Sequence, residues 1–141
     1  MQSLSRSLQP TPGIFELDFC TLVIVSENTA EILIHEGVEV SHAMVEQYID
    51  VLRSTLSAPF CLLVNERNSH SYDFQAQTAL GATDDLLALA LVSYTPTADV
   101  AARSLAQLPR ETNWPMAVFS NKEDALAWLR AMQPASVASA S

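Results

Sequence analysis

Apolar residues along the chain alternate between continuous strand-like runs and stripes at helical spacing. The runs predict strands at Ile14–Phe19 together with Leu22–Ser26, then at Ala30–His35, Phe60–Val64, Leu86–Tyr94 and Met116–Phe119. Between them, stripes of apolar residues predict four helices, which begin after Ser41, Asp73, Thr97 and Ser120. The predicted element order is therefore β-β-α-β-α-β-α-β-α.

Two of these helices carry the clearest signals. After the N-cap candidate Ser41, an apolar stripe predicts a helix to about Leu56; it consists of Val45, Tyr48, Ile49, Leu52 and Leu56. The segment 120–123 is typical of a capping box, and the residues after it form another apolar stripe. Asp73 is expected to cap a shorter helix that Gly81 ends.

Strands that alternate with helices pair in parallel through right-handed crossovers. We therefore predict an α/β domain with a single mixed five-stranded sheet. An N-terminal antiparallel hairpin is followed by parallel β-α units, and the four helices lie largely on one face. The domain covers residues 14–132, with an N-terminal extension at 1–13 and a disordered tail at 133–141.

The last strand and helix resemble a known family. Val118–Ser120 followed by Glu123–Leu129 is similar to the closing signature of small bacterial SpoIIAA-like proteins. Phe60–Asn65, followed by Arg67, resembles their central strand and its polar exit. The resemblance spans about Phe15 to Met132 and implies the SpoIIAA-like fold, which STAS domains share, and a habit of binding other proteins.

The chain departs from STAS domains at one position. The resemblance implies a phosphorylatable serine at the start of the helix after the central strand, in an Asp-Ser-Ser/Thr-Gly context. Residues 65–74 contain no such motif and no glycine, and Ser71 is the nearest positional counterpart. The fold and the protein-binding habit are therefore expected, whereas the phosphorylation switch is not.

The charge balance excludes some partners. The chain has 7 basic and 16 acidic side chains, a net charge of −9, and one lysine, Lys122. Nucleic acids and anionic membranes are disfavoured, because both are bound through clustered Lys and Arg. Charged residues make up only 16%, against about 25% in typical domains, so part of the surface must be apolar.

The sequence predicts a cytoplasmic protein. The N-terminal residues lack the apolar run of a signal peptide, and Leu86–Tyr94 is much shorter than the roughly 20 residues of a membrane-spanning helix. Cys20 and Cys61 both lie in strand-like apolar runs, where buried free thiols are expected. No metal, cofactor or catalytic residue is predicted.

The densest polar cluster follows the strand Phe60–Val64. Carboxyl ends of parallel strands are the usual ligand position in open α/β sheets, so we predict a partner-binding loop there. Its residues are Asn65, Arg67, Asn68, His70, Ser71 and Tyr72. Arg67 and His70 suit a carboxylate or phosphate on a partner. The alternative is a solvated loop in which Arg67 pairs with Glu66 or Asp73.

Other polar groups are weaker candidates. Ser93–Thr97 combines hydroxyls with a helix start and suits a small anion, although capping alone explains it. Ser71, His70 and Asp73 are too close along one loop to form a catalytic triad. His35 and His42 flank Glu36 and Glu39, but their spacing is not that of a metal site.

The N-terminal hairpin is expected to carry apolar side chains on both faces. In a monomer this apolar patch would be exposed to water, which favours a homodimer or a docked partner. We therefore predict a non-enzymatic STAS-like or SpoIIAA-like regulatory module that binds another protein. The alternative is a small apolar-ligand carrier or sensor with a pocket lined by Trp114, Met116, Trp128 and Met132.

Overall fold

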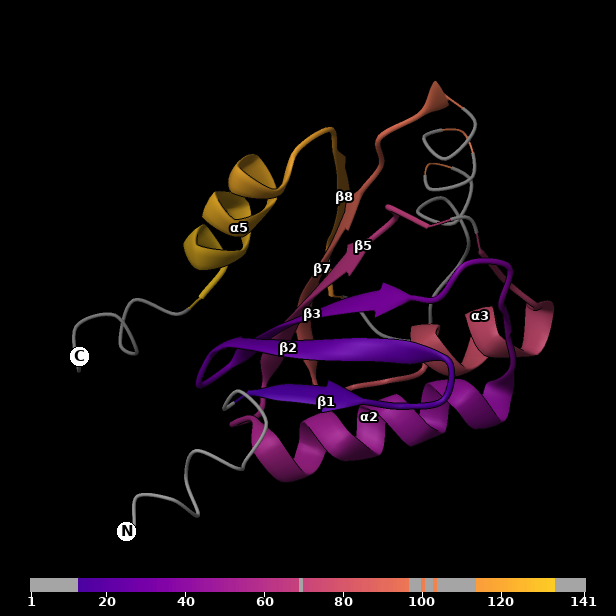
Figure 1. The fold of residues 1–141 in the computed structure, drawn as a ribbon. Coiled ribbons are helices and arrows are strands. Elements are labelled where there is room, and N and C mark those ends of the chain that lie inside the picture. Colours follow the sequence, from indigo (N-terminus) through magenta and orange to yellow (C-terminus); the bar gives the residue numbers. More distant parts are fainter. Residues whose placement is uncertain (1–12, 69, 97–99, 101–102, 104–113, 134–141) are drawn as a thin grey trace, which may run out of the picture.

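The computed structural model describes residues 13–68, 70–96, 100, 103 and 114–133. Within them, one sheet contains six strands in the order β1-β2-β3-β5-β7-β8 (Figure 1). β4 and β6 form a separate pair. The strands are β1 (Ile14–Glu16), β2 (Cys20–Ser26), β3 (Thr29–Ile34), β4 (Glu39–Val40), β5 (Phe60–Asn65), β6 (Ser71–Tyr72), β7 (Leu86–Val92) and β8 (Met116–Phe119). β1, β2 and β3 are antiparallel, whereas β3, β5, β7 and β8 are parallel. The predicted mixed sheet is confirmed.

The main sheet has six strands rather than the five predicted, because the first apolar run divides in two. The N–H of Leu17 donates to the carbonyl of Cys20 over 2.8 Å, and the chain reverses there. Ile14 consequently lies opposite Val23 in an antiparallel pair. The reversal contains neither glycine nor proline, and Asp18, a common turn residue, is its one local turn signal.

Three helices are described: α2 (His42–Thr55), α3 (Phe74–Gly81) and α5 (Lys122–Ala131). Ser41 caps α2 and Asp73 caps α3, each by accepting a hydrogen bond from a backbone N–H three residues further on. Both caps confirm the prediction. The helix predicted after Thr97 falls mostly on residues 97–99, 101–102 and 104–113, outside the described residues.

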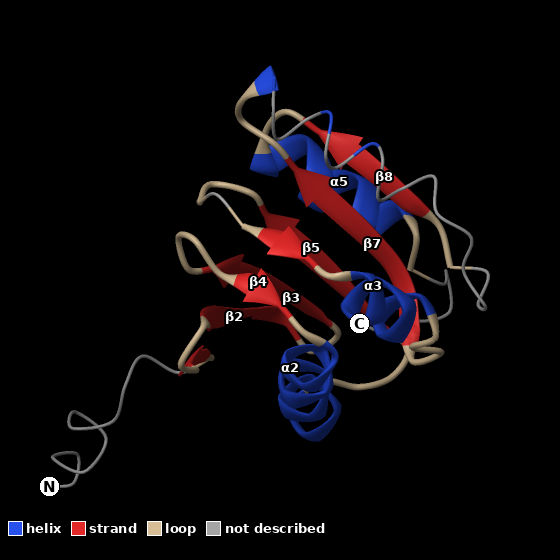
Figure 2. Cartoon of the chain, turned by 90° about the vertical axis from the view of Figure 1, so that its right-hand side faces the viewer, coloured by secondary structure: helices blue, strands red, loops and turns tan. Residues whose placement is uncertain are grey.

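The helices cover both faces of the sheet (Figure 2). α2 and α3 pack together on one face, and the largest core cluster lies beneath them. α5 lies on the opposite face, chiefly over β5, β7 and β8, where Ala125 and Leu129 belong to a second buried cluster with Cys61, Leu63 and Ala90. The expectation of helices largely on one face thus holds for α2 and α3, and α5 departs from it.

The central strands are covered from both sides. Every residue of β5 is buried, as is nearly every residue of β7. This is the pattern expected of parallel strands between two helical layers, and it explains why their sequences are continuous apolar runs. None of the described helices is both long and apolar enough to cross a membrane.

Candidate functional site

The predicted loop leaves the carboxyl end of β5 and returns through β6 to the cap of α3. Asn65, the last residue of β5, is buried and donates from Nδ2 to Glu31 Oε2 on β3 over 2.6 Å. Its Oδ1 accepts from the backbone N–H of Arg67 over 3.1 Å. Asn68 Nδ2 donates to the carbonyl of Ile34 over 3.0 Å. Both asparagines therefore attach the loop to β3.

Glu66 and His70 form a buried pair inside the same loop. Glu66 Oε1 lies 3.5 Å from His70 Nε2, and the two side chains are only 11% and 1% exposed. Burial raises the pKa of Glu66 to about 7. Burial also lowers the pKa of His70, although its contact with the Asn68 carbonyl and the charge of Glu36 oppose that shift.

Tyr72 connects the buried Glu66–His70 pair to α2. Its hydroxyl lies 3.0 Å from that of Tyr48, and its ring packs 5.9 Å from the imidazole of His70. Burial raises the pKa of both tyrosines well above the ordinary value. His70 and Tyr72, both predicted to contact a partner, instead support the loop from within.

Arg67 and Ser71 remain on the outside of the loop. Arg67 is exposed, and its guanidinium forms no ion pair with any described residue. The alternative that pairs Arg67 with Glu66 or Asp73 is not what the structure shows, because Glu66 faces His70 and Asp73 caps α3. Ser71 is exposed on β6, where its backbone N–H donates to Val38.

The other sequence candidates do not assemble into a site. The two nitrogens of His70 face Glu66 and the Asn68 carbonyl, which gives Ser71 no contact with them. Ser93 is buried and its N–H donates to the carbonyl of Phe119, while Thr97 lies outside the described residues. His42 Nε2 lies 3.1 Å from Glu46 on the next turn of α2.

The four residues proposed for an apolar pocket lie in two different clusters. Trp114 and Met116 belong to the core beneath α2 and α3, and the indole N–H of Trp114 donates to the Thr83 carbonyl over 2.9 Å. Trp128 and Met132 belong to the cluster beneath α5. Because the sheet separates these clusters, the four residues cannot line one cavity.

Two features of the structure were not predicted from the sequence. Glu31, in the middle of the apolar strand β3, is buried and accepts from Asn65 and from Lys122 Nζ, the latter over 3.1 Å. The presence of a single carboxylate in an otherwise apolar strand could have indicated this buried interaction. A groove of ≈ 230 Å³ also lies between α2 and α3, lined by His42, Val45, Glu46, Ile49, Arg53, Ala79, Ala82 and Thr83.

Comparison with known proteins identifies the fold. No protein-family model and no curated protein matches the chain. Among solved structures, it is similar to an uncharacterised protein of the DUF3478 family with a SpoIIAA-like fold from Shewanella loihica PV-4. The match has a TM-score of 0.53 and 16% identity, and it covers 86% of this chain and 97% of that chain. This likeness shows the fold alone, and it confirms the expected SpoIIAA-like fold.

Proposed function

We propose that the protein is a non-enzymatic, SpoIIAA-like binding module that recognises another protein through the loop at residues 65–72. The observation that carries the proposal is the contrast within this loop. Asn65, Glu66, Asn68 and His70 are engaged with the protein itself, whereas Arg67 is exposed and has no ion pair among the described residues. A fixed loop that presents one cation suits recognition of a carboxylate or phosphate group.

The same contrast argues against catalysis in the loop. A general base must reach the substrate, and the imidazole of His70 is only 1% exposed, with both nitrogens engaged. Ser71 is exposed, but no hydrogen bond joins its hydroxyl to a carboxylate or imidazole among the described residues. Binding is therefore the function that this geometry favours.

A cytoplasmic location belongs to the proposal. Cys20 and Cys61 are both buried free thiols, as expected of a protein in a reducing compartment. The alternative function, an apolar-ligand carrier, has lost its supporting observation because its four lining residues are divided between two clusters.

The test compares partner capture by three full-length proteins: the unchanged chain, Arg67→Ala and the control Arg130→Ala. Arg130 is an exposed arginine at the end of α5, away from the loop. Each protein is cross-linked in a lysate of its own cells, and the captured proteins are quantified by mass spectrometry. We expect one partner that Arg130→Ala retains and Arg67→Ala loses, with equal thermal midpoints for all three proteins.

Two results would overturn this proposal. Equal recovery of every captured protein by Arg67→Ala removes the loop from recognition. A small molecule retained in native mass spectrometry, without any partner that depends on Arg67, assigns the chain to the carrier class instead.

The homodimer stays a prediction. Size-exclusion chromatography with light scattering tests it on the full chain. A strictly monomeric protein at high micromolar concentration contradicts it.

A further inference from the structure

One face of the N-terminal strands lies outside the area that α5 covers. Leu22 and Ile32 point into the core beneath α2 and α3, so alternation directs their neighbours to the other side. In the register of β1, β2 and β3, the residues that pair with these neighbours point to the same side. We call this surface the hairpin face; it consists of Ile14, Glu16, Thr21, Val23 and Leu33, with Glu31, buried and paired with Lys122 of α5, at its border.

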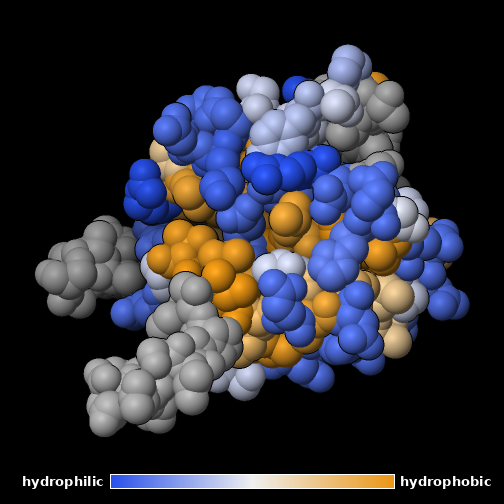
Figure 3. Space-filling model, viewed as in Figure 1, coloured by the Kyte–Doolittle hydropathy of each residue, from blue (hydrophilic) through white to orange (hydrophobic). Residues whose placement is uncertain are grey.

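The hairpin face is apolar at its centre. Ile14, Val23 and Leu33 are only partly buried, and Val25 is 44% exposed beside a bulge in β2. β1 ends the sheet, and its outer edge has no partner strand among the described residues. Figure 3 shows apolar surface over β1 and β2, interrupted by hydrophilic side chains. An apolar surface beside an open sheet edge is typical of a docking site.

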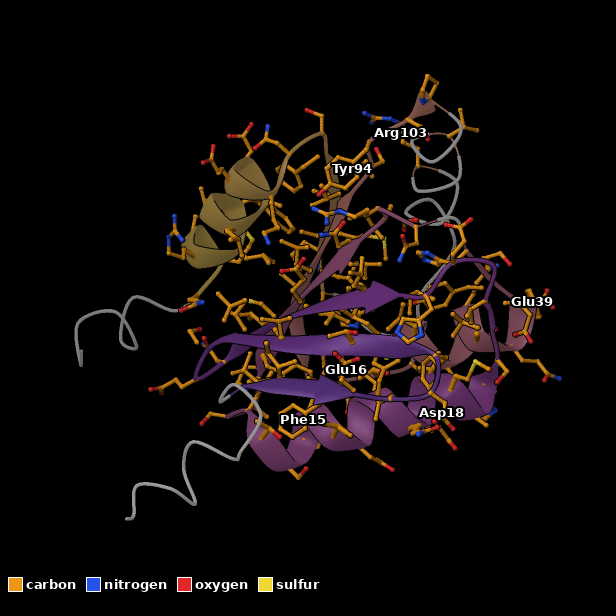
Figure 4. All side chains as sticks on the ribbon, in the orientation of Figure 1. Phe15, Glu16, Asp18, Glu39, Tyr94 and Arg103 are labelled. Carbon is orange, nitrogen blue, oxygen red and sulfur yellow. The ribbon has the colours of Figure 1, made fainter. Side chains whose placement is uncertain are left out.

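The charged side chains of the N-terminal strands and their turns have one sign. Between Arg6 and Arg53 the sequence contains eight acidic residues and no Lys or Arg. Glu16 and Asp18 are exposed along the sheet edge (Figure 4), and Glu27 is exposed in the turn between β2 and β3. Glu31 differs because Lys122 pairs with it from α5. The hairpin face is thus an apolar centre with an acidic rim.

We propose that the hairpin face docks a basic amphipathic segment of another protein. Its apolar side chains would cover Ile14, Val23 and Leu33, and its Lys or Arg residues would lie against Glu16, Asp18 and Glu27. Charge complementarity selects this occupant. A second copy of the chain would bring the same acidic rim against itself, and that repulsion opposes a dimer through this face. Arg67 is not one of the residues of this face, although Asn65, which accepts from the Arg67 N–H, lies opposite Leu33.

The test uses defined peptides and the full-length protein. The probe is a short labelled peptide in which lysine and valine alternate. Two matched peptides replace each lysine by glutamate or each valine by serine. Fluorescence anisotropy measures affinity, and ¹H–¹⁵N spectra locate the peptide by the amide signals that move. We expect only the lysine–valine peptide to bind tightly, and its signals to move within residues 14–33.

Matched double variants separate this face from general acidity. Glu16→Gln/Asp18→Asn removes two carboxylates from the rim, whereas Glu39→Gln/Glu123→Gln removes two exposed carboxylates elsewhere. Rim neutralisation should weaken binding by about two- to fivefold for each carboxylate, as for exposed charge pairs. The control pair should change affinity much less. Val23→Thr should also weaken binding, and Arg67→Ala should leave it unchanged.

Several results would overturn the inference. One is equal weakening by the two double variants, and another is equal binding of the glutamate peptide. A third is movement of signals from the α2–α3 groove or from residues 65–72 instead of residues 14–33. A fourth is a free protein that is dimeric by light scattering and whose hairpin signals the peptide cannot move; that result assigns the face to a second copy.

Discussion

At the scale of single residues, the described part of the loop at 65–72 separates side chains that hold it in place from Arg67 and Ser71, which face outward. Its density of polar residues located the loop from the sequence. The division of roles could not be predicted, because Asn65 bonds to Glu31, which lies 34 residues earlier in the chain. Contacts of this kind depend on which strands become neighbours, and a local pattern does not contain that information.

The Glu66 carboxyl should make stability depend on pH. Its pKa is raised from 4.5 to about 7, so the folded state holds a proton that the unfolded state has released between these values. Stability should therefore fall as pH rises from about 4.5 through about 7. Glu66→Gln removes this loss and should be more stable than the unchanged protein well above pH 7, by on the order of 3 kcal/mol.

Urea unfolding across this pH range measures the effect. His70 contributes with the opposite sign, because a lowered pKa makes stability fall as pH drops below 6.5. The comparison must therefore be with Glu66→Gln, which keeps His70, and with Glu39→Gln, which removes an exposed carboxylate. Parallel stability curves for the unchanged protein and Glu66→Gln would contradict the account of this pair.

At the scale of elements, the sequence pattern predicted the features that depend on contacts within a single segment. The caps of α2 and α3 and the buried stripe of α2 were read correctly, because each lies within one segment. The short strands β1, β4 and β6 were missed as separate elements. They have two or three residues each, and each forms only by pairing with a neighbouring strand.

The cap of α5 differs from the prediction by one residue, and this difference can be measured. Asn121 Oδ1 accepts from the N–H of Asp124 over 2.8 Å, whereas Ser120 precedes the cap. Asn121→Ala should lower the free energy of unfolding by about 1 kcal/mol. Ser120→Ala is the matched control and should change it little. If urea unfolding shows that Ser120→Ala lowers the free energy of unfolding more than Asn121→Ala does, Ser120 is the cap instead.

At the scale of the whole molecule, α5 links the two halves of the sheet. Lys122, at its start, bonds to Glu31, and Gln133, just beyond its end, donates to Thr29 Oγ1 over 3.3 Å. Both acceptors are on β3, which joins the antiparallel and parallel parts of the sheet. The overall topology was predictable from the order of elements, but this connection was not, since it joins residues 91 positions apart.

This link yields a prediction on stability. Lys122→Met leaves the buried Glu31 without its cation and should cost about 1–3 kcal/mol of unfolding free energy. Glu31→Gln added to Lys122→Met should recover most of the loss, because Gln still accepts from Asn65. Chemical denaturation of the two variants tests this. No recovery in the double variant would show that Lys122 stabilises α5 independently of Glu31.

The central proposal is that this chain binds another protein through Arg67. The most direct measurement is the dissociation constant of the captured partner for the unchanged protein, Arg67→Ala and Arg67→Lys, by titration calorimetry. We predict that Arg67→Ala weakens binding by about tenfold or more and that Arg67→Lys restores part of it, since the charge returns without the planar fork. Identical dissociation constants for all three proteins would contradict the claim.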